Sequence, residues 1–221
     1  MSCDDGKIYE ESVVIASEGR VLSMSGRITG IDSWPDGYSI VVAGFGESEF
    51  AVISKPVPAS AVDGEEISVD MSGISGDVTR MEICVINQLR KKIVSFYELD
   101  CSTISDTIKM QVGIINAGMF TGIQKEIFNN SCISCHGVSG KPGAGLYLTE
   151  GKSFEALVGK ISVKDEAGKL LVEPGKATDS FLHEVLNTDI TGNWRIVHSD
   201  IVTSPVLLTL IDKWIDAGAK E

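Results

Sequence analysis

The hydrophobic pattern of this chain changes near its middle, and no other feature constrains the fold more. In the first half, short apolar runs rich in β-branched residues, such as 39–43 and 81–86, are separated by turn signals. In the second half, apolar residues recur at the spacing of one helix face, as Phe120, Ile123 and Ile127 do. The sequence therefore predicts an all-β half followed by an all-α half.

The first half, residues 7–105, is predicted to be an antiparallel, immunoglobulin-like β-sandwich. The strands are expected around 13–15, 39–43, 50–53, 67–69, 81–86 and 93–97, and a hairpin loop is expected at 87–92. The second domain is expected to cover 106–221. Because the linker at 102–107 is short and has no Gly/Pro run, we expect the two domains to touch.

The second half contains the pentapeptide Cys132-Ile133-Ser134-Cys135-His136, which reads C-x-x-C-H. In this pattern the two thiols bind a haem covalently, and the histidine places an imidazole under the iron. A zinc site would need a second cysteine pair, which the chain lacks, and a thioredoxin-like motif would follow a strand rather than a helical pattern. We therefore expect one covalent haem c at Cys132 and Cys135, with His136 as the proximal iron ligand.

Further segments around this pentapeptide occur in an order that resembles a known family. They are Gly145-Leu146-Tyr147-Leu148, then Pro174-Gly175 followed by Ser180-Phe181-Leu182, and finally Trp214-Ile215-Asp216-Ala217-Gly218-Ala219. Because these segments occur in the same order as in the family, approximately residues 108–221 resemble the small monohaem cytochrome c domains of Bacteroidetes and Planctomycetes proteins. The resemblance implies an all-α cytochrome c fold, a haem c cofactor and one-electron exchange with a redox protein partner.

The chain departs from this family at the distal iron ligand. The family carries a methionine before the terminal tryptophan, but this chain has no methionine after Met119, and His198 stands sixteen residues before Trp214. His198 is therefore the predicted distal ligand, with His183 as the second choice. Met110 and Met119 precede the pentapeptide and are expected to fill the core.

The proximal imidazole of His136 should be oriented by a backbone carbonyl within residues 141–145. No distal acid or base beside an open iron position can be identified, so we expect an electron carrier rather than an enzyme such as a peroxidase. A second hypothesis is a surface protein whose sandwich recognises a protein partner or a glycan, with the haem domain as a redox sensor.

Charge and termini indicate the compartment. The net charge of -12 argues against nucleic-acid binding, and no apolar run approaches the ~18 residues of a transmembrane helix. We interpret Met1-Ser2 as an addition to a mature chain whose signal peptide has been removed. Cys3, followed by an acidic pair, resembles the lipid-bearing end of a bacterial lipoprotein. This implies a flexible segment at 1–6, a lipid tether and a location in the periplasm, at the outer membrane or on the cell surface.

Two cysteines remain. Cys84 and Cys101 lie in or beside strand-like segments. They can form a disulfide in an oxidising compartment, or they can be two small buried apolar residues. The sequence leaves both alternatives open.

Overall fold

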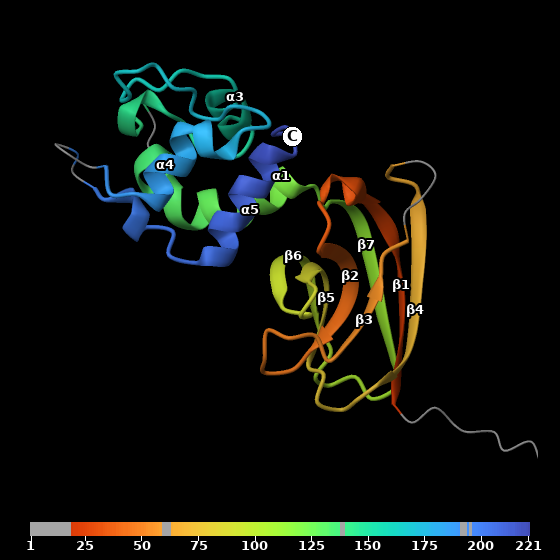
Figure 1. Cartoon of the computed structure of the whole chain (residues 1–221). Coiled ribbons are helices and arrows are strands. Elements are labelled where there is room, and N and C mark those ends of the chain that lie inside the picture. The colour runs from red at the N-terminus through yellow and green to blue at the C-terminus, as the bar shows by residue number, and fades with distance from the viewer. Residues whose placement is uncertain (1–18, 59–62, 138–139, 191–193, 195) are drawn as a thin grey trace, which may run out of the picture.

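The computed structural model describes residues 19–58, 63–137, 140–190, 194 and 196–221. In this part of the chain a β-sandwich comes first, and a segment of short helices follows at one end of it (Figure 1). The strand expected at 13–15 and Cys3, which is expected to carry a lipid, lie outside the described residues. Within the described ranges, no helix is long and apolar enough to cross a membrane.

One sheet of the sandwich has three strands in the order β4-β1-β7. They are β1 (Arg20–Thr29), β4 (Glu66–Ile74) and β7 (Thr107–Asn116). β1 runs antiparallel to β4 but parallel to β7. The prediction of a purely antiparallel sandwich is therefore wrong for this sheet, which is mixed.

β7 also moves the boundary that we expected near residue 105. Ile108 and Met110 are fully buried, while Lys109 and Gln111 between and after them face solvent. This alternation is the period-two pattern of a strand. The β-sandwich therefore extends to Asn116, into the segment predicted to be all-α.

The other sheet has four strands in the order β3-β2-β5-β6, and all its pairs are antiparallel. The strands are β2 (Tyr38–Phe45), β3 (Ile53–Pro56), β5 (Arg80–Asn87) and β6 (Lys92–Asp100). The predicted hairpin between the last two is confirmed. Its loop is held by the Asn87 side chain, whose Oδ1 accepts hydrogen bonds from the backbone N–H groups of Leu89 and Lys91, both at 3.0 Å.

This sheet is buried on both faces. Ile83 and Val85 of β5 point into the sandwich, whereas Cys84 and Ile86 point to the outer face and pack with Phe45. Cys101 belongs to the inner cluster. Cys84 and Cys101 thus lie on opposite sides of the sheet, and both are free buried thiols rather than a disulfide.

The segment after β7 is not the expected all-α cytochrome c fold. Its α-helices are α1 (Met119–Ile123), α2 (Ile133–His136), α3 (Ser153–Leu157), α4 (Phe181–Asn187) and α5 (Pro205–Asp216), and a π-helix, η2 (Gln124–Cys132), joins the first two. Four of these five α-helices have seven residues or fewer. Long loops and isolated bridges, Val158 with Val172 and Ile161 with Leu170, separate them. The prediction of an all-α second domain is therefore wrong.

The longest α-helix, α5, begins and ends at the residues that the sequence indicates. Pro205 occupies the first turn, where its missing N–H costs no hydrogen bond. Ser204 is the N-cap residue, although its side chain makes no capping hydrogen bond. Gly218 follows the helix with φ of 97°, a conformation that glycine adopts without strain.

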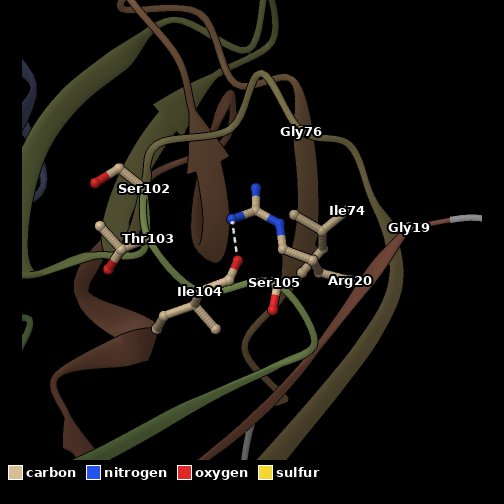
Figure 2. Close-up of a pocket in the computed structure, with 8 residues that line it drawn as sticks. All are labelled: Gly19, Arg20, Ile74, Gly76, Ser102, Thr103, Ile104 and Ser105. Carbon is tan, nitrogen blue, oxygen red and sulfur yellow. Dashed lines mark hydrogen bonds between the residues drawn. The ribbon is translucent and has the colours of Figure 1, made fainter.

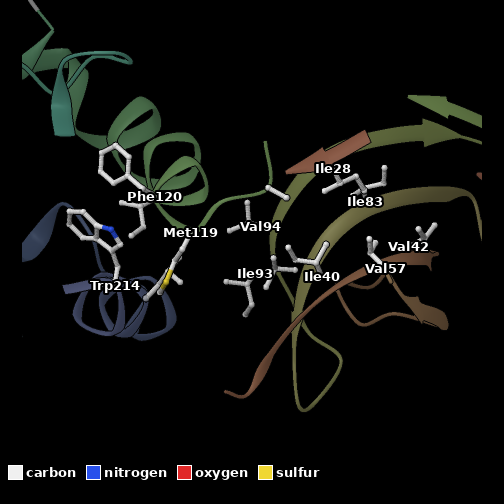
Figure 3. Close-up of a cluster of buried hydrophobic side chains, with 14 of the residues drawn as sticks. Ile28, Ile40, Val42, Val57, Ile83, Ile93, Val94, Met119, Phe120 and Trp214 are labelled. Atoms are coloured by element: carbon white, nitrogen blue, oxygen red, sulfur yellow. The ribbon is translucent and has the colours of Figure 1, made fainter. Parts of the chain in front are cut away.

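The sandwich and the helical segment share one apolar cluster. Figure 3 shows Met119 of the helical segment between Trp214 on one side and Val94 and Ile93 of β6 on the other, with sandwich side chains such as Ile40 beyond them. The two parts are therefore packed against each other, as the short linker predicted.

A buried arginine ties together the opposite end of the sandwich. Nη1 of Arg20 donates to the carbonyl oxygens of Cys101 (2.7 Å) and Ile104 (3.1 Å), and Nη2 donates to those of Ser75 (2.7 Å) and Val78 (2.5 Å). Figure 2 shows this guanidinium beside a pocket of about 480 Å³, which lies away from the pentapeptide. The start of β1 is thus fastened to two turns of the chain.

Replacing Arg20 with leucine should lower the free energy of unfolding by about 3 kcal/mol, because buried carbonyl groups lose their charged donor. Urea unfolding followed by circular dichroism measures this change. Arg27→Leu is the matched control, since Arg27 lies on the same strand but is exposed and should change stability by about 0.5 kcal/mol or less. Equal losses in the two variants would show that the Arg20 hydrogen bonds do not stabilise the fold.

Candidate functional site

A continuous helical stretch from α1 through η2 to α2 positions the pentapeptide. Its buried face carries Phe120, Ile127 and Phe128. The ring of Phe120 lies 5.0 Å from that of Trp214 on α5, which fixes the stretch against the longest helix. Cys132 ends the π-helix, and Cys135 and His136 lie on α2.

The π-helix is held by a buried glutamine. Nε2 of Gln124 donates to the carbonyl oxygen of Leu148 (3.0 Å) and to Oδ1 of Asn129 (2.7 Å), and its Oε1 accepts a hydrogen bond from the Ser153 hydroxyl. These bonds link the helix to the loop that follows the pentapeptide. π-helical turns often occur at functional sites, where they alter the direction of the side chains that follow.

The two thiols of the pentapeptide have different environments. Cys132 is partly buried, and burial, followed by the nearby Cys135, raises the pKa of its thiol to about 11. Cys135 is exposed. Both are free, so both remain available for covalent chemistry.

The His136 imidazole is held by the loop that follows it. Its Nδ1 lies 3.1 Å from the carbonyl oxygen of Leu146, and its own carbonyl accepts a hydrogen bond from the Leu148 N–H (3.0 Å). A Cβ atom at Gly143 would lie only 3.2 Å from Cε1 of the ring, so this glycine lets the loop lie flat against it. The carbonyl that contacts the ring therefore belongs to Leu146, one residue beyond the expected range of 141–145. Because Nδ1 makes this contact, Nε2 is the nitrogen that can bind a metal.

The predicted partner, His198, lies next to His136. The two ring centroids are 6.2 Å apart and the ring planes differ by 47°. His198 begins the 3₁₀-helix η5 (His198–Asp200) and is partly buried. Two imidazoles that bind one metal ion from opposite sides, each at a metal–nitrogen distance of about 2 Å, have centroids about 6 Å apart. The separation therefore fits a metal between the two rings.

The surroundings of His198 favour its neutral form. Burial lowers its pKa, and the neighbouring His136 lowers it further, while a weak hydrogen bond with the Ile196 backbone raises it. A neutral imidazole is the form that binds metals.

The second-choice histidine is engaged elsewhere. His183 on α4 pairs through Nδ1 with Oδ1 of Asp212 on α5 at 2.7 Å, and its carbonyl accepts a hydrogen bond from the Asn187 side chain. Met110 and Met119 are buried in the shared core, as expected. The structure therefore brings His198 rather than His183 or a methionine beside His136.

Some residues around the histidines escaped the sequence analysis. Trp194 lies with its ring 5.5 Å from His198, and Ile133, Ile196 and Ile201, which flank the histidines along the chain, expose 37%, 38% and 42% of their surfaces. Large apolar side chains left exposed often mark a binding surface. Trp194, Ile196 and Ile201 lie outside helices and strands and follow no hydrophobic period, so the sequence gives no signal for them.

The prediction of a metal-binding protein requires correction. In the described ranges, no group of three or more His, Cys, Asp or Glu side chains gathers that can hold a metal ion. The structure is mostly β, and its helical segment is not a cytochrome c fold. The fold therefore does not support the expectation of a haem-binding cytochrome. The hypothesis of a haem site depends on the pentapeptide and the histidine pair alone.

Comparison with known proteins adds no family. No protein-family model, no curated protein and no solved structure matches this chain.

The different environments of the thiols predict different reactivity in the haem-free, reduced protein. At pH 8 the Cys132 thiol is almost entirely protonated and partly covered, so iodoacetamide should modify it much more slowly than Cys135, by roughly tenfold or more. Peptide mapping by mass spectrometry in a Cys3→Ser background measures both rates. Cys84 and Cys101 are the internal controls, because both are buried. Equal labelling of Cys132 and Cys135 would contradict the described environment of Cys132.

Proposed function

We propose that this protein is an extracytoplasmic c-type cytochrome that carries one haem, attached through Cys132 and Cys135, and transfers one electron at a time. The observation that carries the proposal is the pairing of His136 and His198, whose ring centroids are 6.2 Å apart. A porphyrin supplies four of the iron ligands itself. The chain then needs to supply two imidazoles rather than a cluster of three side chains.

The surroundings of the pair fit such a group. The Leu146 carbonyl orients His136 through Nδ1, which is the outer contact that an imidazole ligand ordinarily makes. The exposed isoleucines that flank the two histidines suit the apolar faces of a macrocycle. The C-x-x-C spacing suits covalent attachment.

The haem, when bound, supplies the one-electron chemistry, and the chain supplies its orientation and burial. Imidazole ligands on both sides should give a lower reduction potential than imidazole with thioether, because Met/His ligation raises it. A filled sixth position also leaves no site for peroxide. An electron carrier is therefore favoured over a peroxidase.

Compartment and partners follow from the cofactor. Covalent haem attachment to C-x-x-C-H takes place outside the cytoplasm, so we place the protein in the periplasm or on the cell surface. A lipid on Cys3, which lies outside the described residues, would tether it to a membrane. A redox protein would then exchange electrons with the haem, and nucleic acid would be excluded by the net charge of -12.

Protein produced with haem-attachment machinery should keep its haem absorbance on the polypeptide after denaturation and acid–organic extraction. Replacing both Cys132 and Cys135 with serine should release all haem into the organic phase, because no thioether remains. Cys3→Ser is the control, and it should keep the haem. Complete extraction of haem from the unaltered protein would refute covalent attachment.

The distal ligand can be identified by paired substitutions. His198→Ala should convert the ferric haem from low-spin to high-spin, because the sixth ligand is lost or replaced by water. His183→Ala should leave the spectrum unchanged, since His183 is engaged with Asp212. Absorption and electron paramagnetic resonance spectra measure the spin state. A spin change in the His183 variant alone would assign the ligand to His183 instead.

A further inference from the structure

The two imidazoles of the proposed haem site are held in different ways. His136 has the Leu146 carbonyl 3.1 Å from its Nδ1. Nδ1 of His198 is buried and has no hydrogen bond of ordinary geometry among the described residues, and the Ile196 backbone gives this imidazole only a weak contact. Histidines that bind metals almost always use their second nitrogen in a hydrogen bond, which fixes the orientation of the ring. Something else must therefore orient His198.

Aromatic packing provides that restraint. The ring of Trp194 lies 5.5 Å from the ring of His198 at an angle of 85°, an edge-to-face arrangement. Trp194 packs in turn against Phe181, 6.0 Å away at 65°. Aromatic rings prefer such edge-to-face geometry, because the positive edge of one ring meets the negative face of the other.

The far end of this row of rings is firmly anchored. Phe181 begins α4 and is 5% exposed, and its backbone N–H donates to the Leu170 carbonyl at 2.9 Å. The same helix is joined to α5 by the pair between His183 and Asp212. The position of the His198 ring therefore depends on α4, because Phe181 packs against Trp194 and Trp194 packs against His198.

We propose that Trp194 is the positioning residue of His198, and that its edge-to-face contact supplies the restraint that the buried Nδ1 does not receive from a well-formed hydrogen bond. The inference rests on the proposed haem site, because it concerns the orientation of a ligand within that site. The proposal predicts different effects on the two histidines. His198 is the less firmly held of the two imidazoles, and removal of Trp194 should free His198 while His136 stays in place.

The contact itself can be tested in the haem-free protein. Nuclear magnetic resonance of the imidazole protons should show a ring-current shift at His198 that Trp194→Leu abolishes. Trp194→Phe should retain part of the shift, since it keeps an aromatic ring. The resonances of His183 serve as an internal control and should not move. An unchanged His198 resonance in Trp194→Leu would refute the contact and with it the proposal.

The positioning role is tested in the haem-loaded protein. Trp194→Leu should raise the high-spin fraction of the ferric haem at least tenfold over that of the unaltered protein, because the His198 ring can turn away from the iron. Trp194→Phe should restore most of the low-spin signal, and a thermal unfolding scan should show that both variants remain folded. Phe50→Leu, which replaces an exposed aromatic residue of the sandwich, is the control and should keep the native spectrum.

The outcomes separate the two proposals. If the unaltered protein binds no haem, the proposed function fails, while the imidazole resonances still report on the contact. If haem binds in the low-spin form and Trp194→Leu keeps that spectrum, the positioning role is refuted although the proposed function stands. Should Trp194→Leu fail to fold, Trp194→Met decides, because it also lacks an aromatic ring. A low-spin spectrum equal to that of the unaltered protein, together with an unchanged His198 resonance, would overturn the proposal.

Discussion

The contact between the start of α1 and the end of the sandwich determines where everything after it lies. The indole N–H of Trp34 donates to the Ala117 carbonyl at 2.7 Å, and the Met119 N–H donates to the Ser33 hydroxyl at 2.8 Å. These two bonds satisfy backbone groups at the point where β7 ends and the helical stretch begins. Gly122 lies so close to Trp34 that a Cβ atom there would come within 3.2 Å of the indole ring. The direction of α1, and hence of the pentapeptide beyond it, is thereby fixed.

Two segments of the chain after this junction come together at the candidate site: the helical stretch from α1 to His136, and the segment that leads through His198 to α5. In the first segment, the Phe120 ring contacts Trp214. The second segment brings His198 into place just before α5, the helix that carries Trp214. Because both segments pack on the same aromatic contact, two histidines 62 residues apart in sequence lie with their rings 6.2 Å apart. A site for a ligand between them is therefore a consequence of core packing rather than of local sequence.

The sequence predicted local features well and long-range ones poorly. Strands β2 and β5, the hairpin at 87–92 and the helix from Pro205 could be identified from period and turn chemistry. β1 and β7 were missed although buried and exposed residues alternate along both, because a parallel pair between the first and last strands leaves no local turn signal. The all-α second domain was wrong, since bridges such as that between Val158 and Val172 replace helix in the loops.

The candidate site shows the same division. The pentapeptide and the position of His198 are visible in the sequence, and the structure brings the two histidines together. The carbonyl that contacts His136 was expected within 141–145 but belongs to Leu146, because a backbone acceptor can be located only once the loop is folded. Trp194 was missed altogether, since a loop tryptophan carries no periodic signal and its role appears only through its ring contacts with His198 and Phe181.

The central claim is that one iron lies between His136 and His198. X-ray absorption at the iron K-edge of the haem-loaded protein tests it most directly, because it reports the number and kind of atoms bound to the metal. The account predicts six nitrogen neighbours and no sulfur. A sulfur neighbour, or only five bound atoms, would show that His198 is not the sixth ligand and would contradict the account.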